Sequence, residues 1–129
     1  MILQNIRDQE YFRAGDESIL CELLHPKNFE NFSGMRYSLA HARVEAGQST
    51  LPHRLRKSSE VYYILSGTGT MHIGTEKASV TEGQAIYIPP GSIQFIENTG
   101  TGDLVFLAIV DPLWREEDEE IFRKKDEKD

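Results

Sequence analysis

Two stretches decide the fold of this chain: residues 47–67, GQSTLPHRLRKSSEVYYILSG, and residues 83–98, GQAIYIPPGSIQFIEN. They contain short runs rich in Val, Ile, Tyr and Phe that are bounded by Gly, Pro or Asn. Neither has the apolar period of an amphipathic helix. Pro90-Gly91 combines a fixed φ with a permitted positive φ, which suits a tight turn. The pattern therefore predicts short strands joined by tight turns.

The same punctuation continues outward along residues 18–110, so the whole body is expected to be β-structure. Regular short strands with turn signals are typical of an antiparallel sandwich or barrel. We expect strands at Ser18–Leu24, Met35–Glu45, Val61–Ser66, Thr70–Ile73, Ala78–Thr81, Ala85–Ile88, Ile93–Asn98 and Leu104–Val110.

The spacing of particular residues within the two stretches is more specific. The first stretch places four residues at fixed intervals: Gly47, His53, Glu60 and Gly67. The second places five: Gly83, Pro89, Gly91, Gln94 and Asn98. These intervals resemble the two conserved motifs of the cupin superfamily. The resemblance implies an all-β fold, the double-stranded β-helix or jelly-roll barrel, and a small single-domain member of the family.

The chain departs from the family at two of its four metal-ligand positions. Typical metal-binding cupins hold a divalent ion with three His and one Glu, but here the second His is Leu55 and the third is Gln94. The resemblance leaves His53, Glu60 and Gln94 as a degenerate metal set for Zn, Ni, Fe or Mn. The alternative is a metal-free barrel in which Glu60 forms hydrogen bonds with His53 and Gln94.

Strand alternation places several of these side chains toward one pocket. The expected substrate-pocket residues are Leu55, Tyr62, Ile64, Gln94 and Ile96. A His–Glu pair in a pocket is a common arrangement for a general base, and a neighbouring tyrosine is able to donate a proton. The candidate catalytic residues are therefore His53, Glu60 and Tyr62.

Two classes of function remain open from the sequence. The first is a small-molecule-binding cupin with a weak or atypical divalent metal site and isomerase- or dioxygenase-like activity. The second is a metal-free cupin, acting either as a non-enzymatic ligand-binding module or as a His-based sugar epimerase or isomerase. Fold alone does not choose between them, and the sequence does not say whether the protein is an enzyme.

Composition narrows the setting. A length of 129 residues suits one domain, residues 1–129, with its barrel core at about 18–110 and a tail at 112–129. A net charge of −7 argues against nucleic acid, and no apolar run approaches the ~20 residues of a membrane span. No signal peptide is visible, and Cys21 is a single cysteine, so a cytoplasmic location is expected.

Two further expectations concern the surface. Residues 111–129 carry more than half of the acidic excess, and we expect a short amphipathic C-terminal helix at about 115–124 that docks through Trp114 and Phe122. Apolar residues are also expected on the outer face of the barrel. They are Tyr63, Leu65, Tyr87 and Phe95. Such a face needs a cover, which predicts a homodimer; coverage by the N-terminal strand and the tail is the alternative.

Overall fold

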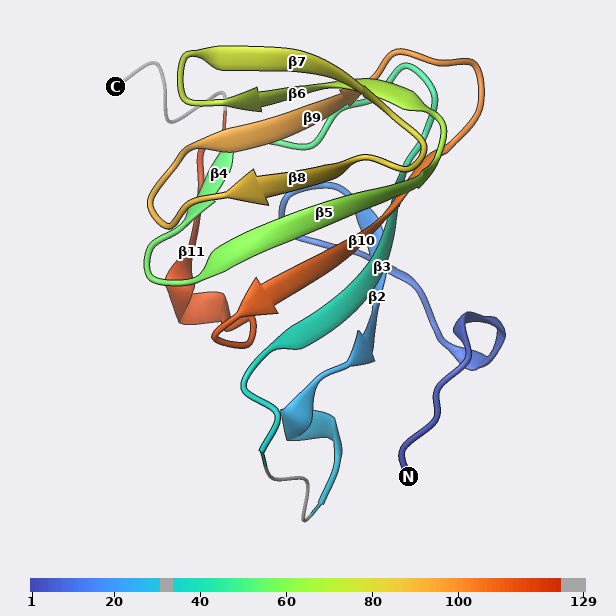
Figure 1. Ribbon diagram of the computed structural model, residues 1–129, viewed down its shortest axis with the longest axis vertical. Helices are drawn as coiled ribbons and strands as arrows, with labels where there is room; N and C mark the ends of the chain where they lie inside the picture. Colours follow the sequence, from blue (N-terminus) through green and yellow to red (C-terminus); the bar gives the residue numbers. More distant parts are fainter. Residues whose placement is uncertain (31–33, 124–129) are drawn as a thin grey trace.

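The computed structural model describes residues 1–30 and 34–123, which form two antiparallel sheets that face each other (Figure 1). The larger sheet has the order β1 (Phe12–Arg13), β2 (Ile19–Leu24), β3 (Ser38–Val44), β10 (Leu104–Asp111), β5 (Ser59–Ser66), β8 (Ala85–Ile88). The smaller has the order β11 (Glu119–Ile121), β4 (His53–Leu55), β9 (Gln94–Asn98), β6 (Thr68–Ile73), β7 (Glu76–Thr81). The all-β prediction is confirmed.

Each strand expected from the sequence is present with shifted or identical ends. The structure adds three short strands that the sequence pattern did not indicate, β1, β4 and β11. It also has three one-turn 3-10 segments, η1 (Ile6–Asp8), η2 (Pro26–Asn28) and η3 (Glu116–Asp118). The described part of the chain contains no helix that is long and apolar enough to cross a membrane.

The core lies between the two sheets and follows from side-chain alternation. In β3 and β10 every second residue is buried, and the same period holds in β9. The inward side chains make one apolar cluster whose fully buried members include Ile64, Ile96 and Leu104. Close packing of large side chains therefore fills one end of the space between the sheets.

The other end of that space is lined by small side chains. The inward positions of β3 carry Ala40 and Ala42, and β10 contributes Ala108. Ala14 and Gly15 approach from the segment that joins β1 to β2. Because these residues have little or no side chain beyond Cβ, the sheets do not close on one another here, and a pocket of about 100 Å³ remains.

The expected C-terminal helix is wrong. Residues 116–118 form only the single turn η3, and the chain then continues as β11, which pairs with β4 along Glu119–Ile121. Residues 124–129 lie outside the described residues. Glu120, which lies within the expected helix, instead forms an ion pair with Arg54 at 2.7 Å.

Hydrogen bonds to the backbone explain why residues 119–121 form the strand β11 and not part of a helix. The buried carboxylate of Asp118 accepts hydrogen bonds from the backbone N–H groups of Lys57 and Ser58, at 2.8 and 3.1 Å. The Phe122 N–H also donates to the Pro52 carbonyl. Side-chain ion pairs at i,i+4 on a helix stabilise it by only about 0.2–0.5 kcal/mol per pair. Buried hydrogen bonds to a carboxylate contribute more than this.

Candidate functional site

His53 lies on β4 directly opposite Gln94 of β9, at the end of the smaller sheet that borders the pocket. Its Nδ1 is 2.7 Å from the Leu51 carbonyl oxygen. A carbonyl only accepts, so Nδ1 carries a proton and donates it to this bond. The ring orientation is therefore fixed by the backbone, and Nε2 is left to face the pocket.

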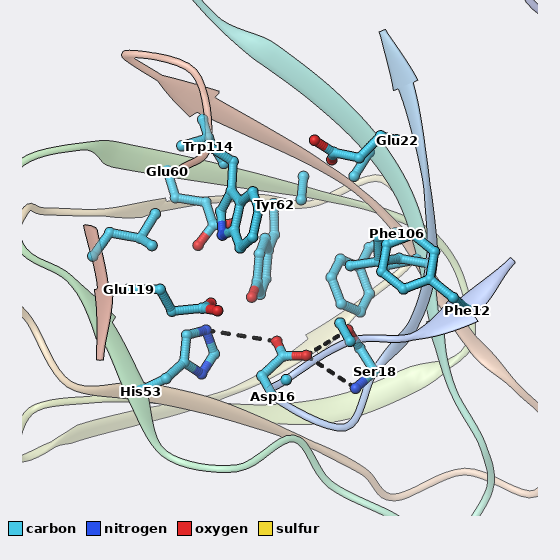
Figure 2. A pocket seen from close by; sticks show the side chains of 18 residues that line it. Phe12, Asp16, Ser18, Glu22, His53, Glu60, Tyr62, Phe106, Trp114 and Glu119 are labelled. Carbon is cyan, nitrogen blue, oxygen red and sulfur yellow. Dashed lines mark hydrogen bonds and ion pairs between the residues drawn. The ribbon is translucent and has the colours of Figure 1, made fainter. Parts of the chain in front are cut away.

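Asp16 approaches Nε2 from the segment between β1 and β2, as Figure 2 shows. One carboxylate oxygen lies 3.6 Å from His53 Nε2. The other accepts hydrogen bonds from the Ser18 backbone N–H at 3.0 Å and from its hydroxyl at 2.7 Å. This Asx-type turn orients Asp16, so the carboxylate is held toward the imidazole by local backbone geometry.

Glu60 enters the site from β5 and is almost completely buried. Its Oε1 accepts a hydrogen bond of 2.7 Å from the side-chain amide of Gln94. The Gln94 carbonyl oxygen is buried with no hydrogen-bond partner among the described residues. Gln94 therefore holds Glu60 in place and does not itself line the pocket.

Burial and charge shift the proton affinities of these groups. Burial lowers the pKa of His53, but the nearby charges of Asp16 and Glu60 raise it, and its pKa lies above the ordinary value. Burial raises the pKa of Glu60 to about 7, against the opposing effects of His53 and Gln94. Glu60 therefore exchanges its proton near neutral pH, as a general acid or base must, and the imidazole beside it keeps its proton to a higher pH than usual.

Two aromatic residues and a further carboxyl complete this side of the pocket (Figure 2). Burial raises the pKa of Tyr62 well above its ordinary value, so its hydroxyl stays protonated and is a potential donor. Glu119 is brought in by β11, and burial raises its pKa, while a hydrogen bond from the Trp114 side chain lowers it. Tyr62 also packs on Phe106, with ring centroids 4.4 Å apart.

The residues at the four family ligand positions do not fit the three-His, one-Glu set. Leu55 presents an alkyl side chain to the pocket, and the Gln94 amide nitrogen is bonded to Glu60. Within residues 1–30 and 34–123, no three His, Cys, Asp or Glu side chains are grouped so as to hold a metal ion.

The structure brings together His53, Glu60, Tyr62 and Leu55 as pocket residues, with Gln94 behind Glu60. The remaining expected pocket residues, Ile64 and Ile96, belong to the apolar core cluster and do not line the pocket. Sequence reasoning missed several residues that do line it. They are Asp16, Glu22, Trp114 and Glu119. For Asp16 a local signal existed, because Asp followed two residues later by Ser favours an Asx turn.

Comparison with known proteins agrees with this fold. Residues 40–110 match the family model for the cupin domain. The chain is 41% identical over 126 residues to an uncharacterized protein of Methanocaldococcus jannaschii, covering 94% of this chain and 98% of that protein. It is 30% identical over 89 residues to an oxalate-binding protein of Thermotoga maritima, covering 69% and 74%.

A solved structure with the same fold is Pac13, a nucleoside dehydratase of Streptomyces, with a TM-score of 0.72 and 20% identity over 95% of this chain and 92% of that one. The two-sheet architecture and the family match define a cupin fold. This chain belongs to the cupin family, whose members similar to it include enzymes and small-molecule-binding proteins.

The raised pKa of Glu60 predicts a pH dependence of stability. Between its unfolded value of 4.5 and its folded value of about 7, the unfolded state loses the proton first. At about 1.4 kcal/mol per pKa unit, stability should fall by roughly 3 kcal/mol as pH rises through this window. The raised pKa of His53 acts in the same direction, because the stabilisation of its protonated form is lost as pH rises.

Urea unfolding of Glu60→Gln at pH 4.5 and pH 7.5 tests this prediction, since the amide keeps a hydrogen-bond acceptor and removes the titration. We expect a smaller loss of stability between the two pH values than in the parent protein. The exposed change Glu82→Gln serves as a control with the same change in charge. An unaltered pH slope in Glu60→Gln would contradict the assignment.

Proposed function

We propose that this cupin binds a small molecule in the pocket between its sheets and moves protons to and from it through His53, without a metal ion. The observation that carries the proposal is that each ring nitrogen of His53 has a defined partner. Nδ1 donates to the Leu51 carbonyl at 2.7 Å, while Nε2 faces the pocket 3.6 Å from Asp16. The same arrangement orients a histidine as general acid or base in many enzymes.

Each polar group then has a role in proton transfer. Protonated His53 donates from Nε2, and the neutral ring accepts a proton at the same atom. Asp16 stabilises the imidazolium by its charge and does not need to take the proton. Tyr62 stays protonated and supplies a second donor from the inner wall of the pocket.

Isomerisation or epimerisation is the reaction class that this set supports best. A C–H proton leaves the ligand as its electron pair shifts toward a neighbouring carbonyl, and a proton returns at another position or on the other face. The step conserves atoms and electrons, so it needs no oxidant, reductant or further reactant. His53, Asp16 and Tyr62 supply the required donors and acceptors.

Deuterium exchange tests the proposal without knowledge of the natural substrate. The protein is incubated in D₂O with a panel of small 2-hydroxy and 2-amino carbonyl compounds, and loss of C–H signals is followed by NMR. We expect His53→Gln to slow exchange by at least about 100-fold, because a positioned acid or base contributes about 10²–10⁴. His72→Gln, on the strand β6 and outside the pocket, should keep the parent rate.

Parent-like exchange in His53→Gln would remove the histidine from the mechanism. Ligand binding without exchange for any compound of the panel would instead support the non-enzymatic binding module. The first result contradicts the role of His53, and the second contradicts proton transfer itself and so separates the binding protein from the enzyme.

A weak divalent site is the second candidate, because the buried Gln94 carbonyl oxygen lacks a partner among the described residues. Positions 53 and 94 face each other across two strands, and Glu60 bonds to Gln94. The double change Leu55→His and Gln94→His should therefore create tight, stoichiometric binding of Zn, Ni or Fe, since imidazole is a better donor than an amide.

Calorimetric titration of the parent and the double variant measures this effect. We expect binding to the variant to be at least about 100-fold tighter, with Zn recovering the stability lost by placing a polar ring at Leu55. Equal, tight binding by the parent would favour the metal-dependent candidate over the proposed metal-free chemistry.

We also propose a homodimer that forms through the outer face of the larger sheet. Tyr63 and Tyr87 are 40% and 60% exposed on adjacent strands, while the alternate residue Tyr62 is buried. The N-terminal segment covers a different part of that face, where the Tyr11 hydroxyl bonds to His41 at 2.8 Å.

We further propose a cytoplasmic location, which rests on the single, buried Cys21.

Light scattering at micromolar concentration should give the mass of a dimer, and the double change Tyr63→Lys and Tyr87→Lys should give a folded monomer. Burial of about 1,000 Å² in total is the minimum expected for a stable interface. A monomeric parent protein at that concentration would contradict the proposal.

A further inference from the structure

The charge of the pocket is unbalanced. Four carboxyl side chains line it, from Asp16, Glu22, Glu60 and Glu119. His53 is the one basic side chain among the described lining residues, and none of them is Lys or Arg. A ligand that carries negative charge would meet four like-charged or neutral carboxyl groups and one imidazole. A positively charged ligand would instead be attracted by the carboxylates and repelled only by the imidazole when it is protonated.

Glu22 shows this imbalance most directly, because the proton-transfer mechanism does not use it. It lies on β2, across the pocket from His53 (Figure 2). Its Oε2 is buried and has no hydrogen-bond partner in the part of the chain that the structure describes. The nearest ring nitrogen, His25 Nε2 at 3.6 Å, already bonds to the Trp114 carbonyl at 2.8 Å.

His25 does not act as a cation for Glu22. Its Nε2 must be the donor to the Trp114 carbonyl, while Nδ1 accepts from the Lys27 backbone N–H at 3.2 Å, so the ring is neutral. Burial also lowers the pKa of His25. The Lys27 ammonium lies over the Trp114 ring, 5.6 Å from its centroid, and forms no ion pair with Glu22 among the described residues.

The apolar lining suits the other part of a small organic cation. Aromatic rings of Phe12, Tyr62, Phe106 and Trp114 line the same pocket as the carboxyl groups. Aromatic faces attract ammonium groups, and alkyl carbons pack against the rings and the alanines. The cavity of about 100 Å³ is somewhat smaller than the ~150 Å³ that accommodates benzene, so the ligand is limited to a few heavy atoms.

We propose that the ligand of this pocket carries a small alkylammonium group, with its positive end among the carboxylates and its alkyl part against the aromatic rings and alanines. The inference rests on the proposed function only in using the same pocket. It excludes an oxalate-like dianion as the preferred ligand, although the relative of Thermotoga maritima is an oxalate-binding protein.

The carboxyl groups of the pocket make binding of such a cation depend on pH. Burial raises the pKa of Glu22 to about 7, against the charge of Lys27, which lowers it. A bound cation favours the ionised carboxylates, so binding should release protons and become tighter as pH rises through 7. Asp16, His53 and Tyr62 face the same space and take part in the same balance.

Three probes of nearly the same shape separate the classes of ligand: isobutylammonium, isobutanol and isobutyrate. Calorimetric titration at pH 7.5, in two buffers of different ionisation enthalpy, measures affinity and proton release. We expect isobutylammonium to bind at least tenfold more tightly than either other probe, with release of protons. Binding of isobutylammonium should weaken several-fold at pH 6.

Matched variants locate the charge that is responsible. Glu22→Gln keeps the shape of the side chain and should weaken isobutylammonium binding about tenfold, with little effect on isobutanol. Glu82→Gln makes the same change in net charge at an exposed position outside the pocket and should not alter binding. Phe12→Leu, on the exposed edge strand β1, removes one ring and should weaken binding by a smaller factor.

The inference is overturned if isobutanol or isobutyrate binds more tightly than isobutylammonium, if none of the three binds at millimolar concentration, or if Glu22→Gln and Glu82→Gln behave alike. None of these results bears on His53, whose role depends on deuterium exchange. Conversely, loss of the His53 assignment would leave an ammonium-binding pocket without proton transfer.

Discussion

Burial of several carboxyl groups beside a single imidazole is the interaction on which the rest of the site depends. An ionised carboxylate that is removed from water costs several kcal/mol unless a positive or hydrogen-bonding partner compensates it. Gln94 donates a hydrogen bond to Glu60, and Ser18 donates one to Asp16. The charge of His53 is shared between the two carboxyl groups. Glu60 therefore exchanges its proton near neutral pH, which is the property that acid–base chemistry requires.

Much of the barrel was predictable from local signals. Turn residues at regular intervals gave the strands, and alternation correctly placed Tyr62 inside and Tyr63 outside. The two motifs also singled out His53, Glu60 and Gln94, which lie on β4, on β5 of the facing sheet and on β9. These predictions succeeded where a short stretch of sequence determines its own backbone geometry.

The remainder depends on contacts between distant parts of the chain. The Asp118 carboxylate holds the tail against the sheet by accepting hydrogen bonds from the backbone N–H groups of Lys57 and Ser58. The sequence of the tail alone does not indicate these partners. A charged segment with helical spacing therefore became a strand. Glu119 lies within the expected helix, yet it pairs with β4 as part of β11 and lines the pocket.

The pocket draws on both flanks of the family-defining segment. Residues 40–110 match the cupin family, but Asp16, Glu22, Trp114 and Glu119 lie outside that range. The shared barrel thus supplies the histidine and the cavity, whereas most of the negative charge comes from segments that pack onto it. A cupin with the same barrel and different flanking segments would present a different set of charges to its ligand. Substitutions in the flanking segments are therefore able to change the ligand that is bound without changing the core that stabilises the fold.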